Sequence, residues 1–212
     1  MCELDVWEPR FEDHLRRVMA TDPAHDLSHI RRVVANAKRI ATAEQAQMEV
    51  VVPAAWLHDV VKFGKSDPRN KESARLAAAE AIRFLREAGY PEQYIGAIAH
   101  AIEAHSFSGN VEPQTLEAKC VQDADRMDAL GAIGIARTFA TTGTMGRPLY
   151  CEDDPWAERR ELNDKEYALD HFEQKLFRVA ETLNTHAGRG EGRKRAEFLR
   201  AYIEQLRTEL GE

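Results

Sequence analysis

The amino-acid sequence predicts an all-α protein, a single compact bundle of about seven or eight helices that covers residues 1–212. Apolar residues recur at spacings of three and four through most of the chain, which is the pattern of amphipathic helices. No segment of useful length alternates apolar and polar residues as a half-buried strand would. The chain has no internal repeat and no low-complexity tract, and its length suits one sizeable core.

The first half of the chain supplies five of the predicted helices. In order, they cover Glu8–Ala20, Ser28–Ala46, Val50–Phe63, Lys71–Ala88 and Pro91 to about Ser106. The third is nearly all apolar up to His58, so we expect it to be the central, buried helix. Gly89 and Pro91 mark the boundary between the fourth and fifth, because glycine commonly ends a helix and proline is tolerated in a first turn.

The second half is predicted to contain one long helix followed by two more. The long helix covers Leu116–Thr141 and carries Gly131 and Gly134, which we interpret as permitting close helix packing. The later helices cover about Lys165–Leu183 and 193–210. Irregular loops are expected near 64–70, 107–115, 142–163 and 184–192, and the basic, glycine-rich run GRGEGRKR at 188–195 is interpreted as a surface loop.

Composition and charge restrict the function classes. Charged residues make up 31 % and hydrophobic residues 43 % of the chain, as in ordinary globular proteins. The net charge of -7 argues against polymeric nucleic acid as a partner, but it allows a small anionic substrate in a local basic pocket. The longest apolar run, Val50 to Leu57, is too short for a membrane span, and the first residues lack a signal-peptide pattern.

The three cysteines indicate a reducing environment. Cys2, Cys120 and Cys151 are widely spaced and form no CxxC motif. They therefore suggest neither a disulfide framework nor a thiolate zinc site. A cytoplasmic location fits this pattern best.

The dipeptide His58-Asp59, at the end of the apolar run, is the first candidate for chemistry. Two ligands alone hold a catalytic metal poorly, so partners are required. His29, in HDLSH at the start of the second predicted helix, is one candidate, and Asp125, in QDADRMDAL, is another. Two further aspartates of that segment are rivals, Asp123 and Asp128.

The order of these motifs resembles that of the HD-domain metal-dependent phosphohydrolases. An isolated His is followed by His-Asp about thirty residues later and by an Asp in an Ala-Asp-Arg context about sixty-five residues further on. Longer strings look like one bacterial branch, the YpgQ/YedJ-like HD hydrolases. They are HDLSHIRRV (25–33), AAWLHDVVK (54–62), AIEAHSFS (101–108), QDADRMDALGAIGIARTF (122–139), GRPLY (146–150) and HFEQKLFRVAETLNT (171–185). The resemblance covers roughly residues 25–205.

The resemblance implies that His29, His58, Asp59 and Asp125 bind a divalent metal ion. Two imidazoles and two carboxylates suit Mn²⁺, our first expectation, or Mg²⁺, Fe²⁺, Co²⁺ or Ni²⁺. Four protein ligands on an octahedral ion leave positions for a water of lowered pKa and for a phosphoryl oxygen. For each ligand taken alone, the alternative is a helix cap or a hydrogen-bonded core residue.

Three more residues near this motif are candidates for catalysis, in addition to Asp59. Lys62 lies on the same face of the predicted helix and could bind a phosphate oxygen, the alternative being a solvated lysine. His100 and His105 are five residues apart and poorly placed to chelate one ion together. We expect at least one of them to line the pocket, as an acid, a substrate contact or a ligand of a second ion.

The C-terminal half supplies further candidates for substrate binding. Arg147 lies in a glycine-flanked loop, and His171 and Lys175 share a helical face. Arg195, in the basic run, is a candidate to steer a polyphosphate. Near the other end of the chain, a second His-Asp pair, His25-Asp26, precedes His29, and either Asp26 or Ser28 is expected to cap the helix that carries His29.

The function implied by the resemblance is that of a metal-dependent phosphohydrolase, which cleaves an ester or anhydride bond of a small phosphorylated substrate, expected to be a nucleotide. Nucleoside-triphosphate pyrophosphohydrolysis is the specific activity that the branch favours. Val60-Val61-Lys62 stands where alarmone hydrolases have an acidic pair, and the GYP signature of cyclic-dinucleotide phosphodiesterases is absent. The alternatives are a metal-retaining, nucleotide-binding regulatory module with little turnover and an HD-type di-iron oxygenase.

Overall fold

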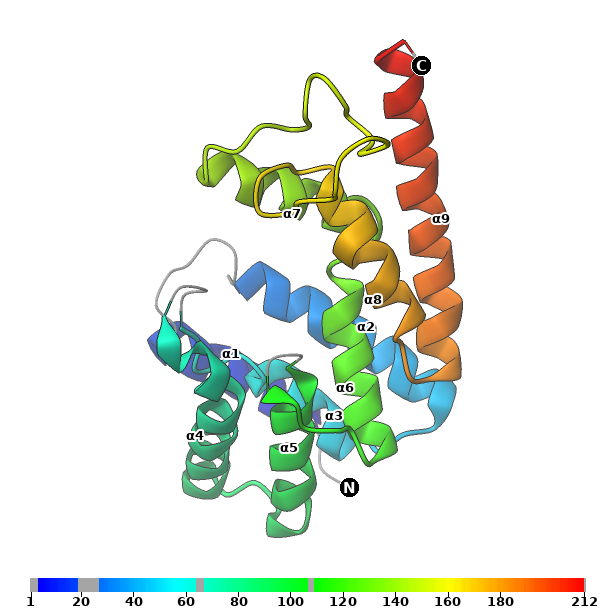
Figure 1. The fold of residues 1–212 in the computed structure, drawn as a ribbon. Helices are drawn as coiled ribbons and strands as arrows, with labels where there is room; N and C mark the ends of the chain where they lie inside the picture. Colours follow the sequence, from blue (N-terminus) through cyan, green and yellow to red (C-terminus); the bar gives the residue numbers. More distant parts are fainter. Residues whose placement is uncertain (1–3, 19–26, 64–66, 107–108, 212) are drawn as a thin grey trace. The chain divides into compact units, whose positions relative to one another are not determined.

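The computed structural model describes residues 4–18, 27–63, 67–106 and 109–211 (Figure 1). Regular secondary structure in these residues is helical throughout, with no strand, which confirms the all-α prediction. The α-helices are α1 (Leu4–Val18), α2 (Leu27–Glu44), α3 (Met48–Leu57), α4 (Ser73–Ala88), α5 (Glu92–His105), α6 (Leu116–Met127), α7 (Gly131–Thr144), α8 (Phe177–Glu181) and α9 (His186–Glu209). A 3₁₀ segment, η2 (Pro68–Glu72), and a π-helical segment, η4 (Phe172–Leu176), complete the set.

The chain divides into two compact units. The first unit comprises Met1–Asp125 together with Asn184–Ala187, and the second comprises Arg126–Leu183 together with Gly188–Glu212. None of the described helices is long and apolar enough to cross a membrane.

Helix α3 is the central element of the first unit. It contacts α1, α2, α4 and α5, and every residue from Val50 to Leu57 is buried. An eight-residue run without a polar position is stable only when neighbours cover all its sides, which is what the sequence predicted. This helix brings the His58-Asp59 dipeptide to the interior of the unit, where both side chains are buried.

The predicted C-terminal end of this helix was wrong. The helix ends at Leu57 rather than Phe63, and residues 58–63 follow as turns, a bend and irregular chain. The Nδ1 atom of His58 binds the carbonyl oxygen of Ala55, and the Val60 amide donates to the Leu57 carbonyl. These contacts satisfy carbonyl groups at the helix end, so the backbone can leave the helical path there.

The predicted helix 116–141 is two helices, α6 and α7, which is a second correction. At the break, the amides of Ala129 and Leu130 donate to carbonyl groups three residues earlier, and Gly131 has a φ of 67°. A Cβ atom on Gly134 would lie 2.2 Å from the Ala129 carbonyl oxygen. The two glycines therefore serve the tight turn between helices rather than the interior of one helix.

The helical boundaries near the C-terminus also differ from the prediction. The helix predicted over about Lys165–Leu183 is helical only in and around η4 and α8. The buried carboxylate of Asp170 accepts hydrogen bonds from Arg160 and from the Asn163 amide. These bonds hold the chain before η4 as a loop. The expected loop at 184–192 is largely the first part of α9. Gly192 is buried, and a Cβ atom there would meet the Leu183 side chain at 2.2 Å. Close packing thus explains a glycine that composition alone assigned to a surface loop.

The core of the second unit lies between η4, α8, α9 and the start of α7. The rings of Phe172 and Tyr202 stack at a centroid distance of 6.0 Å, and Phe139 lies against both. Buried leucines surround them, namely Leu130, Leu169, Leu176, Leu183 and Leu199.

Candidate metal centre

Five side chains of the first unit converge on one buried point. They come from three helices and from the turn after α3, and they are His29, His58, Asp59, His105 and Asp125. Ligand atoms of His29, His58 and Asp125 all lie within 4.8 Å of one another, and so do those of His58, Asp59 and His105. The two groups share His58, so the five side chains form one continuous cluster.

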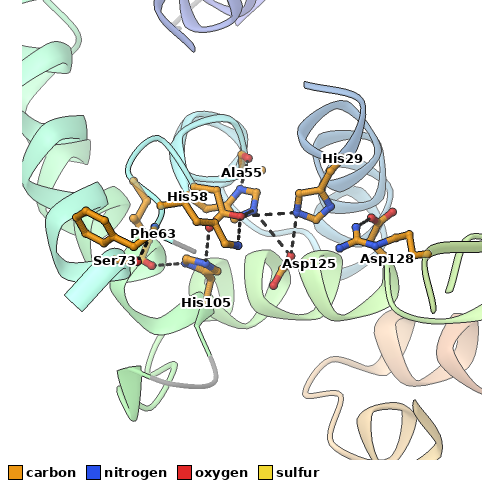
Figure 2. A network of polar contacts seen from close by, with 12 residues as sticks. His29, Ala55, His58, Phe63, Ser73, His105, Asp125 and Asp128 are labelled. Atoms are coloured by element: carbon orange, nitrogen blue, oxygen red, sulfur yellow. Dashed lines mark hydrogen bonds and ion pairs between the residues drawn. The ribbon is translucent and has the colours of Figure 1, made fainter. Parts of the chain in front are cut away.

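The imidazole of His58 lies between those of His29 and His105 (Figure 2). Its ring centroid is 5.5 Å from that of His29 and 4.8 Å from that of His105, and both neighbours approach edge-on. Helices α2 and α5 supply the two outer histidines. The predicted ligands from distant parts of the sequence are therefore placed side by side by the packing around α3.

The two carboxylates face the histidine nitrogens. Asp125 Oδ1 lies 3.3 Å from His29 Nε2 and 3.8 Å from His58 Nε2. Asp59 Oδ2 lies 3.6 Å from His58 Nε2 and 3.9 Å from His29 Nε2. Three of these separations are too long for a hydrogen bond, but they fit groups arranged around an ion between them.

The sequence left open whether His100 or His105 lies in the pocket. In the structure, His105 is the one that belongs to the cluster. Its Nε2 atom lies 3.5 Å from Asp59 Oδ1, and its side chain is buried. His100, by contrast, accepts a hydrogen bond on Nε2 from the Gln114 amide and is outside the cluster. Their separation along α5 turns them to different sides of the helix, as the five-residue spacing implied.

The backbone fixes which nitrogen of His58 and His105 faces the carboxylates. His58 Nδ1 lies 2.8 Å from the Ala55 carbonyl oxygen, and His105 Nδ1 lies 2.5 Å from that of Ile102. A carbonyl accepts only, so Nδ1 carries the proton, and in a neutral ring the lone pair is on Nε2. His58 Nε2 is fully buried without a hydrogen-bond partner. This orphaned lone pair, directed at two carboxylates, fits a bound cation, and the bond from Nδ1 to a carbonyl is typical of metal-binding histidines.

The electrostatics of the cluster favour a cation. Burial lowers the pKa of His58 to about 4, so its ring is neutral at neutral pH. Burial works to raise the pKa of Asp59 and of Asp125, but the neighbouring imidazoles, and Lys62 in the case of Asp59, hold both carboxyl groups below their usual range. Burial would lower the pKa of His105, yet its hydrogen bond to Asp59 and the charges of both aspartates raise it. The site therefore presents two ionised carboxylates and at least one neutral imidazole.

Lys62 lies beside the cluster but not on a helical face, since α3 has ended. Its Nζ atom donates to Asp59 Oδ2 at 2.5 Å, and its side chain is 30 % exposed. The predicted proximity of Lys62 to Asp59 is thus observed, although a different local backbone produces it.

The structure also separates Asp125 from its two rivals on the same segment. Asp123 is fully buried and accepts four hydrogen bonds, two from Asn184 and two from Thr185. Asp128, which is buried, forms an ion pair with the partly exposed Arg137. Both therefore have structural partners, and Asp125 is the aspartate that faces the histidines.

The remaining predicted substrate contacts belong to the second unit. His171 Nδ1 pairs with Asp164 Oδ2 at 3.0 Å, Arg147 Nη1 donates to the Asp164 carbonyl oxygen at 3.3 Å, and Lys175 is exposed. Sequence reasoning missed Asp164, whose only signal was its position seven residues before His171.

Arg195 binds the Met127 carbonyl and Glu191, so its guanidinium links α9 to the end of α6. His25 and Asp26 lie outside the described residues.

A helical bundle that gathers a His, a His-Asp pair and a later Asp is the arrangement of an HD-type protein, and these residues form a group able to hold a metal ion. Residues 26–130 match the model of the HD domain family. The protein YpgQ of Bacillus subtilis (strain 168), itself uncharacterised, is 32 % identical over 190 residues, which are 88 % of this chain and 84 % of YpgQ. The chain therefore belongs to the HD domain family.

Solved structures support this assignment at the level of the fold. The crystal structure of Bacillus subtilis YpgQ superposes with a TM-score of 0.76 at 31 % identity, over 100 % of this chain and 98 % of that one. YpgQ in complex with ADP gives 0.74 at 31 % identity, over 95 % and 93 % of the two chains. An HD-superfamily hydrolase from Bacillus thuringiensis gives 0.73 at 31 % identity, over 95 % and 97 %.

Proposed function

We propose that this protein is a metal-dependent phosphohydrolase of small nucleotides and that it converts nucleoside triphosphates to monophosphates and pyrophosphate. His29, His58, Asp59 and Asp125 would hold the ion, for which we propose Mn²⁺. A bound ion of this kind supplies a water of lowered pKa and polarises the phosphoryl group that the water attacks. The similarity to YpgQ, which has been crystallised with ADP, supports a nucleotide as the substrate class.

The observation that carries the proposal is the buried, unpartnered Nε2 atom of His58 facing the carboxylates of Asp59 and Asp125. A buried lone pair next to two anions is unfavourable unless a cation is shared among them. Among the four proposed ligands, only Asp125 is appreciably exposed, with 29 % of its side chain accessible against 4 % for His29 and Asp59 and 0 % for His58. A substrate would thus approach the centre from the side of Asp125.

The chain's other polar groups would bind and orient the substrate. Lys62 contacts the Asp59 carboxylate of the cluster, and we propose that its ammonium group contacts a phosphoryl oxygen during turnover. His105, which contacts Asp59, would hold a proton close to the reacting groups or serve as a further ligand. Arg147, His171 and Lys175 remain proposed contacts for the phosphate chain. Arg195 remains a proposed residue for steering a polyphosphate, and its guanidinium binds the Met127 carbonyl and Glu191 in this structure.

The test is a comparison of turnover and product identity on a nucleotide panel. The wild-type protein, loaded with Mn²⁺, is incubated with nucleoside mono-, di- and triphosphates, and orthophosphate and pyrophosphate are resolved. Asp125→Asn removes a proposed ligand, and Asp13→Asn, at an exposed position of α1, is the matched control. We expect pyrophosphate from triphosphates with wild type and control, and a loss of at least about 100-fold with Asp125→Asn.

Each other outcome selects a different function. Orthophosphate as the only product would replace pyrophosphohydrolysis by a phosphatase activity. Nucleotide binding without turnover would favour the regulatory module. Consumption of dioxygen by an iron-loaded sample would favour the oxygenase. Equal rates for Asp125→Asn and wild type on every compound would refute the proposed metal centre.

A further inference from the structure

Lys62 makes its hydrogen bond to the Asp59 carboxylate oxygen that faces His29 and His58. Its Nζ atom lies 2.5 Å from Asp59 Oδ2, and this oxygen also lies 3.6 Å from His58 Nε2. The other oxygen, Oδ1, is directed to His105 at 3.5 Å. An ion bound between His58 and Asp59 would thus compete with the ammonium group for Oδ2.

The metal-free centre needs such an internal cation. Asp59 is buried, and the carboxylate of Asp125 belongs to the same cluster. Two ionised carboxylates that share a buried site repel each other unless positive charge lies close by. The ammonium group of Lys62 supplies such a charge, because its Nζ atom is in direct contact with Asp59 Oδ2.

The local chain allows the ammonium group to move. Lys62 lies beyond the end of α3, in a segment without helical hydrogen bonds, and 30 % of its side chain is exposed. A lysine side chain has four rotatable carbon–carbon bonds and a strongly hydrated head group. It can therefore release Asp59 without disturbing the buried residues of the helix.

We propose that Lys62 is an internal counter-ion of the metal centre, which neutralises Asp59 when the centre is empty and is displaced from Oδ2 when a divalent ion binds. This inference rests on the metal centre of the proposed function. It assigns Lys62 a second role besides substrate binding, since displacement frees the ammonium group at the moment when the centre becomes able to act. Displacing Lys62 from Asp59 costs free energy, so the lysine makes the affinity of the centre for the metal ion lower than it would be without this charge.

The test is the dissociation constant for Mn²⁺, measured by titration calorimetry without nucleotide. Lys62→Met keeps an unbranched side chain up to the position of Cε and removes the ammonium group, and Lys62→Gln is a second neutral variant. Lys71→Met, at an exposed position of η2, changes the net charge equally without a contact to Asp59 and is the matched control. Lys62→Arg retains a cation.

We expect both neutral variants to bind Mn²⁺ about tenfold more tightly than wild type, a change of about 1.4 kcal/mol. Lys62→Arg and Lys71→Met should stay within about threefold of wild type. Equal or weaker binding by Lys62→Met and Lys62→Gln would overturn the proposal, because the lysine would then only position Asp59. If Lys71→Met bound Mn²⁺ as tightly as the neutral Lys62 variants, the proposal would also be overturned, because the gain in affinity would then come from the change in net charge.

The measurement separates this inference from the proposed function. Absence of Mn²⁺ binding by the wild-type protein would overturn both. Tighter binding by the neutral variants, in a wild-type protein that turns over no nucleotide, would support the counter-ion and refute the phosphohydrolase. If wild type turned over nucleotides but the neutral variants bound Mn²⁺ with unchanged affinity, the phosphohydrolase would be supported and the counter-ion refuted.

Discussion

The Nδ1 atom of His58 lies 2.8 Å from the carbonyl oxygen of Ala55, three residues earlier in the chain. This contact links the end of α3 to the chemistry of the cluster. It satisfies a carbonyl group at the helix terminus, and it leaves the lone pair on Nε2, the atom that faces Asp59 and Asp125. A single side chain therefore ends the helix and orients a proposed ligand.

Two substitutions at this position separate the two roles. His58→Asn keeps a polar group near Nδ1, and His58→Gln keeps one near Nε2. We expect His58→Asn to lose the rise in thermal stability that Mn²⁺ gives, which for wild type at 100 times the dissociation constant corresponds to about 2.7 kcal/mol. His58→Gln should retain part of it. Thermal unfolding with and without Mn²⁺ measures both, and an unchanged rise in His58→Asn would exclude His58 as a ligand.

Asp123 and Asp125 lie two residues apart, and we expect their substitutions to have different effects on stability and on metal binding. Asp123→Ala leaves the four hydrogen-bond donors of Asn184 and Thr185 without their acceptor in a buried position, so we expect a loss of about 3 kcal/mol or more in the free energy of unfolding. Asp125→Ala should cost little stability without metal and abolish Mn²⁺ binding. Urea unfolding and metal titration of both variants check this. The assignment fails if Asp123→Ala is as stable as wild type.

The sequence was sufficient for the fold class and for the positions of the proposed ligands. Amphipathic spacing defines the helices of the first unit, and the motif order pairs His58-Asp59 with His29 and Asp125. It was insufficient where the outcome depends on contacts between distant segments. The choice of His105 over His100 depends on which face of α5 meets α3, and the residues of α5 alone do not determine it.

The helix boundaries show the same limit. The break between α6 and α7 requires a left-handed Gly131, and the helical state of 188–195 requires that Gly192 pack against Leu183. At 188–195, local composition predicts the reverse, because glycine is a weak helix former and is common in loops. Tertiary packing overrides that preference here. The organisation of residues 1–212 as one domain stays a prediction.

Glycines of α7 offer a test of this packing argument. Gly134→Ala would place a methyl group 2.2 Å from the backbone oxygen of Ala129, which cannot move away as a side chain could. We expect this variant to lose about 2 kcal/mol or more of stability. Gly143→Ala in the same helix meets no atom within 4 Å and should instead gain about 0.5 kcal/mol. Urea unfolding of the pair is the measurement, and equal stabilities would contradict the close approach.

A buried histidine away from the metal centre, His14, is expected to make stability depend on pH. His14 of α1 is 7 % exposed, and its ring stacks on Phe84 of α4 at a centroid distance of 3.9 Å. Burial lowers the pKa of His14, opposed by the carboxylate of Glu80, whose Oε1 lies 3.4 Å from Nε2. The nearby cations Arg17 and Arg83 act in the same direction as burial, and Glu87 opposes them.

The direction of the pH effect follows from the lowered pKa of His14. The unfolded chain takes up a proton on His14 as the pH falls through about 6.5, whereas the folded protein does so only at lower pH. Stability is therefore fully present above about pH 6.5 and declines below it, by at most about 1.4 kcal/mol per pH unit for this one group. The decline ends once the folded protein also binds the proton.

His14→Leu should remove this contribution while keeping an apolar group against Phe84. We expect the free energy of unfolding of wild type to fall more steeply between pH 7.5 and pH 5.5 than that of the variant. His186→Leu, at an exposed position of α9, is the control and should follow wild type. Urea unfolding at a series of pH values in EDTA isolates the effect from metal binding. Parallel curves for wild type and His14→Leu would show that the buried imidazole of His14 does not couple to folding.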